Sequence, residues 1–303
     1  MISRTLPGKL RESLPAYAFL APWLVGLVGL TLVPMVLSLY YSFTDYSLLA
    51  PPVWEGLANY QRMLSDDRYQ HSLVVTFTYV LLSVPLEMVF ALAVAVVLNQ
   101  GLKAVAFYRA VYYVPSLLGG SVAIAILWRQ IFGADGLVNH LLSSVGVDGP
   151  SWMASPDTSL LTLVLLRVWQ FGAPMVIFLA GLRQIPGDVL EAAEVDGAGR
   201  VRRFLHITLP LLSPIVFFNL VLQIIGAFQA FTPAFIVSGG SGGPSDSTLF
   251  YTLYLYQKAF GSFEMGYAAA MAWVLLLIIA GFTVANFVMS RRWVFYADER
   301  EAR

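Results

Sequence analysis

Six apolar runs, each long enough to cross a lipid bilayer, limit how this chain can fold more than any other feature of its sequence. Hydrophobic residues make up 58% of the 303 residues and charged residues 12%, which is more apolar surface than a soluble domain of this length can bury. We therefore predict an all-α membrane protein with six transmembrane helices. The predicted spans are residues 16–43, 72–98, 107–132, 158–182, 211–237 and 265–290.

Prolines and glycines interrupt two of these runs. Pro34 is expected to kink the first span, because a proline inside a helix removes one backbone hydrogen bond and clashes with the preceding turn. Pro115 and the pair Gly119-Gly120 predict a bend in the middle of the third span. The first run is much longer than the core of a signal peptide and lacks a clear cleavage site, so we predict that it stays as a span.

The distribution of lysine and arginine predicts the orientation. The expected cytoplasmic side holds thirteen of these residues and the opposite side three, so the positive-inside rule places both termini in the cytoplasm. The predicted domain plan is a cytoplasmic segment 1–15, a transmembrane domain 16–290 with a cytoplasmic loop 183–210, and a cytoplasmic tail 291–303. The thirteen residues are Arg4, Lys9, Arg11, Lys103, Arg109, Arg183, Arg200, Arg202, Arg203, Arg291, Arg292, Arg300 and Arg303, and the three are Arg62, Arg68 and Lys258.

The stretch from Glu191 to Pro214 begins with polar, glycine-punctuated sequence between two apolar runs. Asp188 stands three residues before Glu191, which is the spacing of a capping box, and predicts a helix over 188–195. Gly197 allows a sharp turn, and a second short helix over 200–207 is expected to end at Leu209-Pro210. From the residues alone, this stretch could also be an amphipathic linker on the membrane surface.

Its motif resembles the EAA signature of permease subunits of ABC importers, and the flanking residues resemble the carbohydrate-uptake branch. The resemblance rests on Glu191-Ala192-Ala193, Gly197, Ile207 and Leu209-Pro210, and extends over nearly the whole chain. It implies a type I permease bundle in a bacterial or archaeal cytoplasmic membrane. The implied partners are a second homologous permease, two ATPase subunits and an extracytoplasmic solute-binding protein. The implied ATPase-coupling residues are Asp188, Glu191, Ala192, Ala193, Glu194, Asp196, Gly197, Arg200, Ile207, Leu209 and Pro210.

The sequence carries no nucleotide-binding motif of its own. No Gly-x-x-x-x-Gly-Lys-Ser/Thr stretch is present. ATP and magnesium are therefore expected to bind to a partner ATPase, and this chain is not expected to be an enzyme itself. The histidines His71, His140 and His206 are scattered between the two predicted membrane sides, and the chain has no cysteine, which argues against a metal site. A formal net charge of zero argues against a nucleic-acid partner. The loop Gly239–Pro244 is either flexible or a contact element for a substrate-delivering protein.

Two ionisable residues, Glu87 and Arg167, lie near the middle of predicted spans. Unpaired charges at that depth are costly, so they are expected to face the protein interior, a partner or a water-filled path. They could form a structural pair, hydrogen-bond a polar solute, or contact another subunit.

Amides and aromatic rings in the fourth and fifth spans are candidates for a sugar pathway, since amides bond hydroxyls and rings stack on C–H faces. Polar contacts between packed helices are an equally common use of such residues. Gln223 and Gln229 could line one path only if the helix broke near Gly226. The candidates, with Glu87 and Arg167, are Trp169, Gln170, Phe171, Asn219, Gln223, Phe228 and Gln229.

The prediction from sequence is thus a permease subunit that forms half of an ATP-driven pathway for a mono- to oligosaccharide or related polyol. Arg167, if it faces the pathway, would admit an acidic sugar or a sugar phosphate instead. An ion-coupled secondary transporter using Glu87 and Arg167, and a membrane scaffold or insertase subunit, are the rival hypotheses. The sequence does not specify which sugar is carried.

Overall fold

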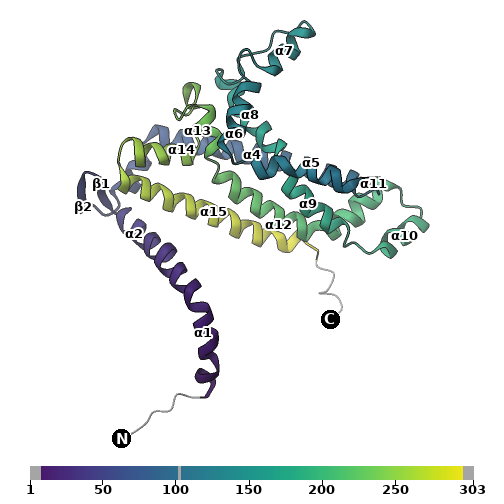
Figure 1. The fold of residues 1–303 in the computed structure, drawn as a ribbon, viewed down its shortest axis with the longest axis horizontal. Helices are drawn as coiled ribbons and strands as arrows, with labels where there is room; N and C mark the ends of the chain where they lie inside the picture. The colour runs from purple at the N-terminus through teal and green to yellow at the C-terminus, as the bar shows by residue number, and fades with distance from the viewer. Residues whose placement is uncertain (1–7, 102–103, 296–303) are drawn as a thin grey trace. The chain divides into compact units, whose positions relative to one another are not determined.

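The structure is a computed structural model that describes residues 8–101 and 104–295. Figure 1 labels the helices and strands. The helices are α1 (Gly8–Leu27), α2 (Val33–Tyr41), α3 (Ala58–Met63), α4 (Asp67–Leu98), α5 (Val105–Leu118), α6 (Val122–Ile131), α7 (Leu137–Ser144), α8 (Pro156–Trp169), α9 (Gly172–Leu182), α10 (Gly187–Val195), α11 (Arg200–Arg203), α12 (Leu209–Phe228), α13 (Thr232–Val237), α14 (Tyr251–Tyr256) and α15 (Met265–Trp293). Three π-helical turns (Val28–Leu32, Phe204–Thr208 and Gln257–Gly261) and a 3-10 turn (Pro244–Asp246) complete the helical elements of the described chain.

The six predicted spans correspond to helices in the described residues. Four stretches are long and apolar enough to cross a membrane, namely 19–41, 67–98, 200–237 and 265–293. Two bent pairs, α5 with α6 and α8 with α9, supply two more if each pair counts as one span. The second span begins earlier than predicted, because Asp66 caps α4 by accepting a 3.1 Å hydrogen bond from the backbone N–H of Tyr69.

The predicted bend of the third span is confirmed. α5 and α6 meet at an angle of 101° across Gly119-Gly120. Ser121 then begins α6 by accepting a hydrogen bond from the backbone N–H of Ile124. A glycine pair followed by a serine cap therefore stops one helix and starts another in a new direction.

Two prolines are accommodated by π-helical turns rather than by helix ends. The Val33 N–H bonds the Val28 carbonyl five residues back, just before Pro34, and the Leu209 N–H bonds the Phe204 carbonyl just before Pro210. The wider turn leaves room for a residue that lacks its own N–H. The prediction that Leu209-Pro210 ends the second short helix is therefore wrong, because α11 continues through the π turn into α12.

The chain divides into two compact units, and the larger one comprises residues 63–257 and 274–303, of which 63–101, 104–257 and 274–295 are described. In it, α4 packs against α8, α9, α12 and α14. Ala91 and Ala95 of α4 are fully buried, so neighbouring backbones approach closely. Gly172 plays the same part on α9, where a Cβ atom would lie 2.1 Å from the Tyr112 carbonyl oxygen of α5.

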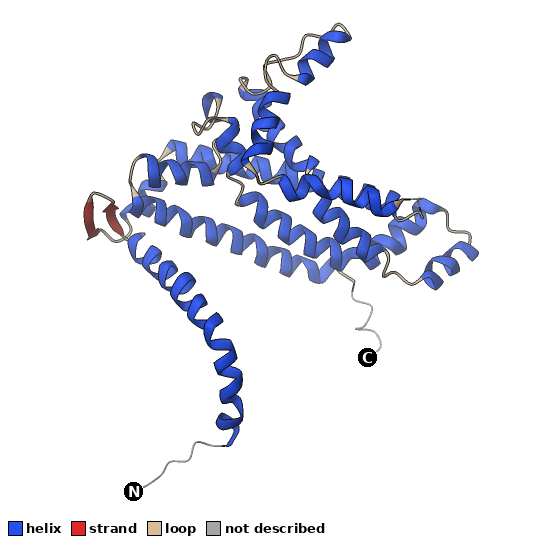
Figure 2. Ribbon diagram, viewed as in Figure 1, coloured by secondary structure: helices blue, strands red, loops and turns tan. Residues whose placement is uncertain are grey.

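The smaller unit comprises residues 1–62 and 258–273, of which 8–62 and 258–273 are described. It contains an antiparallel hairpin of β1 (Thr44–Ser47) and β2 (Ala50–Trp54), the red arrows of Figure 2. The Asn59 amide donates to the Ser42 and Thr44 carbonyls at 3.2 and 3.0 Å and holds the entry to the hairpin. The hairpin lies between the first and second predicted spans, and β2 includes Pro51-Pro52, a pair that is typical of a loop.

Other departures lie in the long loops. α7 forms inside the polar stretch 133–157, and α14 with its π turn lies inside the expected loop 238–264.

The predicted cytoplasmic residues Arg4, Lys103, Arg300 and Arg303 lie outside the described residues, as do residues 1–7 of the N-terminal segment and 296–303 of the tail.

Candidate functional site

The segment that carries the EAA-like motif forms α10 and α11, joined by a glycine turn. α10 starts at Gly187 with Pro186 at the N-cap, and no side-chain cap hydrogen bond is made there. The predicted capping box is therefore wrong. Proline fixes the backbone at the helix start, and Asp188 lies inside the first turn, where a carboxylate still interacts favourably with the helix dipole.

Gly197 closes α10 as predicted. Its φ is +80°, its N–H bonds the Glu194 carbonyl at 3.0 Å, and the Ala198 N–H bonds the Ala193 carbonyl at 2.9 Å. These two bonds form a Schellman motif, which requires a left-handed residue at the position of Gly197. The angle between α10 and α11 is thus set by hydrogen bonds that a residue with a side chain would strain.

An ion pair fastens the two short helices together. Arg203 of α11 donates to a Glu194 carboxylate oxygen of α10 at 2.6 Å. From the sequence, Glu194 was expected to contact a partner chain, and no role was predicted for Arg203 in this turn. The two residues flank the glycine turn and pair with each other instead. Glu194 has a second role here, because its carboxylate holds the turn that Gly197 shapes.

The exposed surface of this segment includes two apolar side chains. Val195 is 88% exposed and Val201 73%, while Ala193 is 8% exposed and packs inward. Ala192, in contrast, lies on the surface. The two alanines of the motif therefore have different environments, and Ala192 is the one available to a partner. The other implied coupling residues are Glu191 and Asp196, which are exposed, Arg200, exposed on α11, and Ile207, Leu209 and Pro210, half-buried along the continuous helix.

The intramembrane charges form a buried cluster. Arg167 on α8 donates from Nε to Glu87 of α4 at 2.7 Å. Its Nη2 donates to the side-chain oxygen of Gln223 on α12 at 2.6 Å and to the Gln223 backbone carbonyl at 3.1 Å. One guanidinium therefore joins three helices, and the paired arrangement is the one observed.

A cavity of about 210 Å³ lies beside this cluster. Arg167, Gln170 and Gln229 line it together with Tyr79, which sequence reasoning did not select, and Gly226. Gln170 is held there by a 3.2 Å hydrogen bond from its amide to the Gly119 carbonyl. The helix does not break near Gly226, since α12 runs to Phe228, and Gln223 does not line the cavity. Gln229 reaches the cavity because it follows the helix end.

The remaining pathway candidates do not line this cavity. Phe171 and Phe228 are buried in aromatic clusters, and Trp169 is 36% exposed with its ring 5.9 Å from that of Trp128. Asn219 is buried and donates to the Pro174 carbonyl at 3.4 Å. Phe171, Phe228 and Asn219 therefore have the environment of packed helix contacts, whereas Trp169 lies on the surface.

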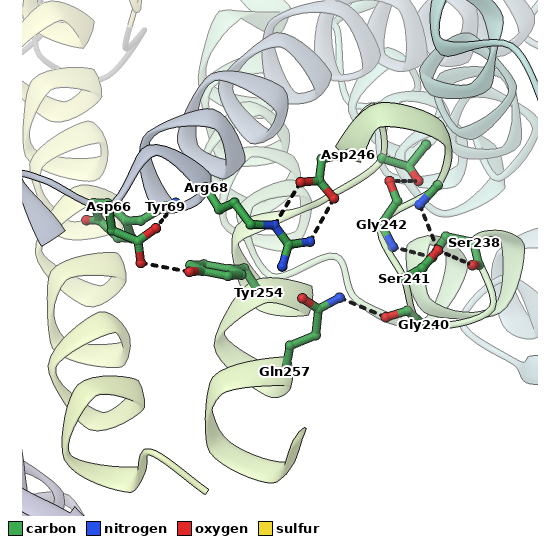
Figure 3. A network of polar contacts seen from close by, with 12 residues as sticks. Asp66, Arg68, Tyr69, Ser238, Gly240, Ser241, Gly242, Asp246, Tyr254 and Gln257 are labelled. Carbon is green, nitrogen blue, oxygen red and sulfur yellow. Dashed lines mark hydrogen bonds and ion pairs between the residues drawn. The ribbon is translucent and has the colours of Figure 1, made fainter. Parts of the chain in front are cut away.

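A second polar network orders the glycine-rich loop, as Figure 3 shows. Arg68 makes two 2.8 Å hydrogen bonds to the Asp246 carboxylate, and Gln257 donates to the Gly240 carbonyl at 2.8 Å. The hydrogen bond from Arg68 lowers the pKa of Asp246 below its usual value. Thr248 also donates to the Gly242 carbonyl at 2.8 Å. A loop held by this many side-chain contacts is a fixed surface feature, unlike the flexible loop considered from sequence.

Within the described residues, no group of three or more histidine or acidic side chains could hold a metal ion.

Comparison with known proteins gives the family. Residues 63–294 match the model of the binding-protein-dependent transport system inner membrane component. The chain is 54% identical to the probable ABC transporter permease protein YesP of Bacillus subtilis, over 96% of this chain and 95% of that protein. It is 33% identical to the arabinooligosaccharides transport system permease protein AraP of the same species, over 87% of this chain and 84% of that protein. It is 29% identical to the lactose transport system permease protein LacF of Rhizobium radiobacter, over 91% of this chain and 93% of that protein.

The fold has a solved counterpart. A chain of a bacterial alginate ABC transporter in complex with an alginate pentasaccharide-bound periplasmic protein superimposes with a TM-score of 0.81, at 20% identity, over 94% of this chain and 96% of that one. The resemblance seen in the Glu191 to Pro210 motif is thereby confirmed at the level of the family and the fold. The chain therefore belongs to the family of binding-protein-dependent transport system inner membrane components, as a multi-pass permease of the cytoplasmic membrane.

Proposed function

We propose that this permease forms half of the translocation pathway of an ATP-driven importer for a sugar, either a mono- to oligosaccharide or a related polyol. Relatives named for lactose and arabinooligosaccharide transport support this class of cargo. ATP and magnesium would bind to a partner ATPase, and this chain would transmit the motion.

The charge balance of the cavity favours a neutral solute. Arg167 is the one cation among the described residues that line it, and its charge is compensated by Glu87. A carboxylate or phosphate on the cargo would have to displace Glu87 or remain without a countercharge, which is costly at membrane depth. Hydroxyls can instead accept from or donate to Gln170 and Gln229 without disturbing the ion pair.

The coupling role rests on one observation in particular. α11 passes through the π turn into α12 without a loop, and α12 carries Gln223, the partner of Arg167. A push on the exposed face of α10 and α11 is thereby transmitted along one helix toward the cavity. In this proposal Val195, Val201 and Ala192 contact the ATPase, and Glu191 and Asp196 pair with its basic groups.

The proposed complex contains a second homologous permease, two ATPase subunits and an extracytoplasmic solute-binding protein. The neighbouring alginate importer was crystallised with a periplasmic protein, which supports the last of these partners. The ordered loop that Arg68 and Asp246 hold lies between predicted spans five and six, on the side that the positive-inside rule places outside.

Co-purification and uptake test the proposal together. A tagged chain expressed in its native cells should recover an ATPase in stoichiometric amount, and the complex in proteoliposomes should hydrolyse ATP faster with a sugar-loaded binding protein. Labelled neutral sugars should accumulate only with ATP inside. Recovery of the chain without an ATPase, or uptake driven by an ion gradient alone, would contradict it.

A further inference from the structure

A second cavity, of about 440 Å³, lies where the end of α4 meets the segment of α10 and α11. Its polar lining comprises Asn99 and Gln100 after α4, Arg200 and Arg203 of α11, and Thr208 of the π turn. By the positive-inside rule this end of the helices faces the cytoplasm, so the cavity lies at the height of the inner lipid headgroups.

Most of its polar side chains have no partner in the described chain. Arg203 is bound to Glu194, but the side chains of Asn99, Gln100, Arg200 and Thr208 make no hydrogen bond or ion pair within residues 8–101 and 104–295. One uncompensated guanidinium, two amides and a hydroxyl of the same cavity are thus free to bind a ligand. The cavity beside Arg167 differs, because its arginine is already neutralised there.

The other walls are apolar. Leu182 at the end of α9 is 5% exposed, and Phe204 of the π turn and Val96 of α4 also line the cavity. A ligand that satisfies both kinds of wall carries an anionic group with several acceptor oxygens on an apolar body.

We propose that this cavity binds the phosphate-bearing headgroup of an anionic phospholipid of the inner leaflet. Basic cavities between transmembrane helices on the cytoplasmic side have the chemistry that such headgroups require. The phosphate oxygens accept from Arg200, Asn99 and Gln100, and the acyl chains follow Val96 and Leu182 toward the bilayer. The headgroup then contacts both the membrane end of α4 and the segment that carries the EAA-like motif.

Photolabelling of the assembled complex tests the site directly. The probe is phosphatidylglycerol with a photoreactive group near its headgroup, and the readout is the yield of labelled peptides covering 93–100 and 182–208. Wild type should be labelled there. Arg200→Gln should lower the yield about fivefold, since one basic residue near the surface contributes about that factor. Arg200→Lys, which keeps the charge, should keep most of the labelling.

Arg202→Gln is the matched control, because Arg202 belongs to the same exposed helix and does not line the cavity. It should label as wild type does. Equal losses of labelling yield in Arg200→Gln and Arg202→Gln would show that only general surface charge attracts the lipid. That result would overturn the proposed binding site. Equal labelling by a phosphatidylcholine probe would do the same.

Soluble phosphate is the other source of the same chemistry. Inorganic phosphate at constant ionic strength should leave the phosphatidylglycerol labelling unchanged. Displacement of the probe by phosphate would overturn the lipid assignment in favour of a small soluble anion. Because the readout is binding and not uptake, neither result depends on which sugar the permease carries.

Discussion

The Nε atom of Arg167 lies 2.7 Å from a carboxylate oxygen of Glu87, and the two side chains are 14% and 3% exposed. The pair joins α8 to α4, the helix around which the larger unit packs. Both charges are largely buried at membrane depth, so each depends on the other for compensation. The two opposite charges compensate each other, so the pair as a whole is neutral.

Removing one partner should therefore cost more than removing both. Arg167→Leu leaves the Glu87 carboxylate buried and alone, and we expect a loss of about 3–5 kcal/mol in unfolding free energy. The double variant Glu87→Gln with Arg167→Gln should recover much of it. The unfolding midpoint in denaturant, measured on the purified complex, gives both values. Similar losses in the single and double variants would show that the pair is not the stabilising unit.

The same variants separate cargo recognition from structure. Arg167→Gln with Glu87→Gln should leave uptake of neutral sugars closer to wild type than Arg167→Leu does. Uptake of labelled neutral and anionic sugars into proteoliposomes provides the comparison. A selective loss of anionic sugar uptake in the double variant would instead assign Arg167 to binding an acidic cargo.

Gly197 and Gly199 form a natural pair for testing the coupling turn. A Cβ atom would meet open space at both, but φ is +80° at Gly197 and −63° at Gly199. Gly197→Val forces a β-branched residue into the left-handed region at a cost of about 1–3 kcal/mol, whereas Gly199→Ala costs little. We expect Gly197→Val to abolish ATP-linked uptake while the complex still binds its solute-binding protein, and Gly199→Ala to transport normally. Near-normal uptake by Gly197→Val in membrane vesicles would contradict the rigid-turn account.

Features governed by short-range backbone rules could be predicted from the sequence. The six spans follow from run length, the bend of the third span from Gly119-Gly120, and the sharp end of α10 from Gly197. Each depends only on neighbouring residues and on the thickness of a bilayer.

Features that depend on contacts distant in sequence could not be predicted. The partner of Arg167 could be proposed but not chosen, because Glu87 is eighty residues away. The continuation of α11 past Pro210 depends on a π turn, which leaves no clear mark in the sequence. Phe171 and Phe228 were candidates for stacking against a sugar. They are instead buried in aromatic clusters, and this burial depends on neighbouring helices that are distant in sequence.

The ordering of the glycine-rich loop should depend on pH in acid. Arg68 lowers the pKa of Asp246 in the folded protein, so the pair stabilises the loop above the carboxyl's unfolded pKa, about 3.9, and this stabilisation is lost as the pH falls through the folded pKa. The chain has no cysteine, so a single spin label at Ser245→Cys can report loop mobility. We expect an immobile label at neutral pH and a mobile one in strong acid.

Asp246→Asn supplies the control for that titration. The neutral amide cannot form the ion pair, so the label should be more mobile at neutral pH and should lose the acid transition. Asp148→Asn, in a different loop, should leave the titration as in wild type. A titration that survives Asp246→Asn would assign the transition to another group.

Close packing between α5 and α9 makes Gly172 sensitive to a single methyl group. A Cβ atom there would lie 2.1 Å from the Tyr112 carbonyl oxygen and 2.8 Å from the Ser116 hydroxyl, whereas at Gly120 it would meet open space. Gly172→Ala must push the two helices apart, because the nearest atom belongs to the backbone and cannot rotate away. We expect a loss of about 1–3 kcal/mol in unfolding free energy, measured in denaturant, with Gly120→Ala close to wild type. Equal stability of the two variants would mean that α5 can move away from α9 at little cost, and that this contact does not hold the bent third span against the fourth.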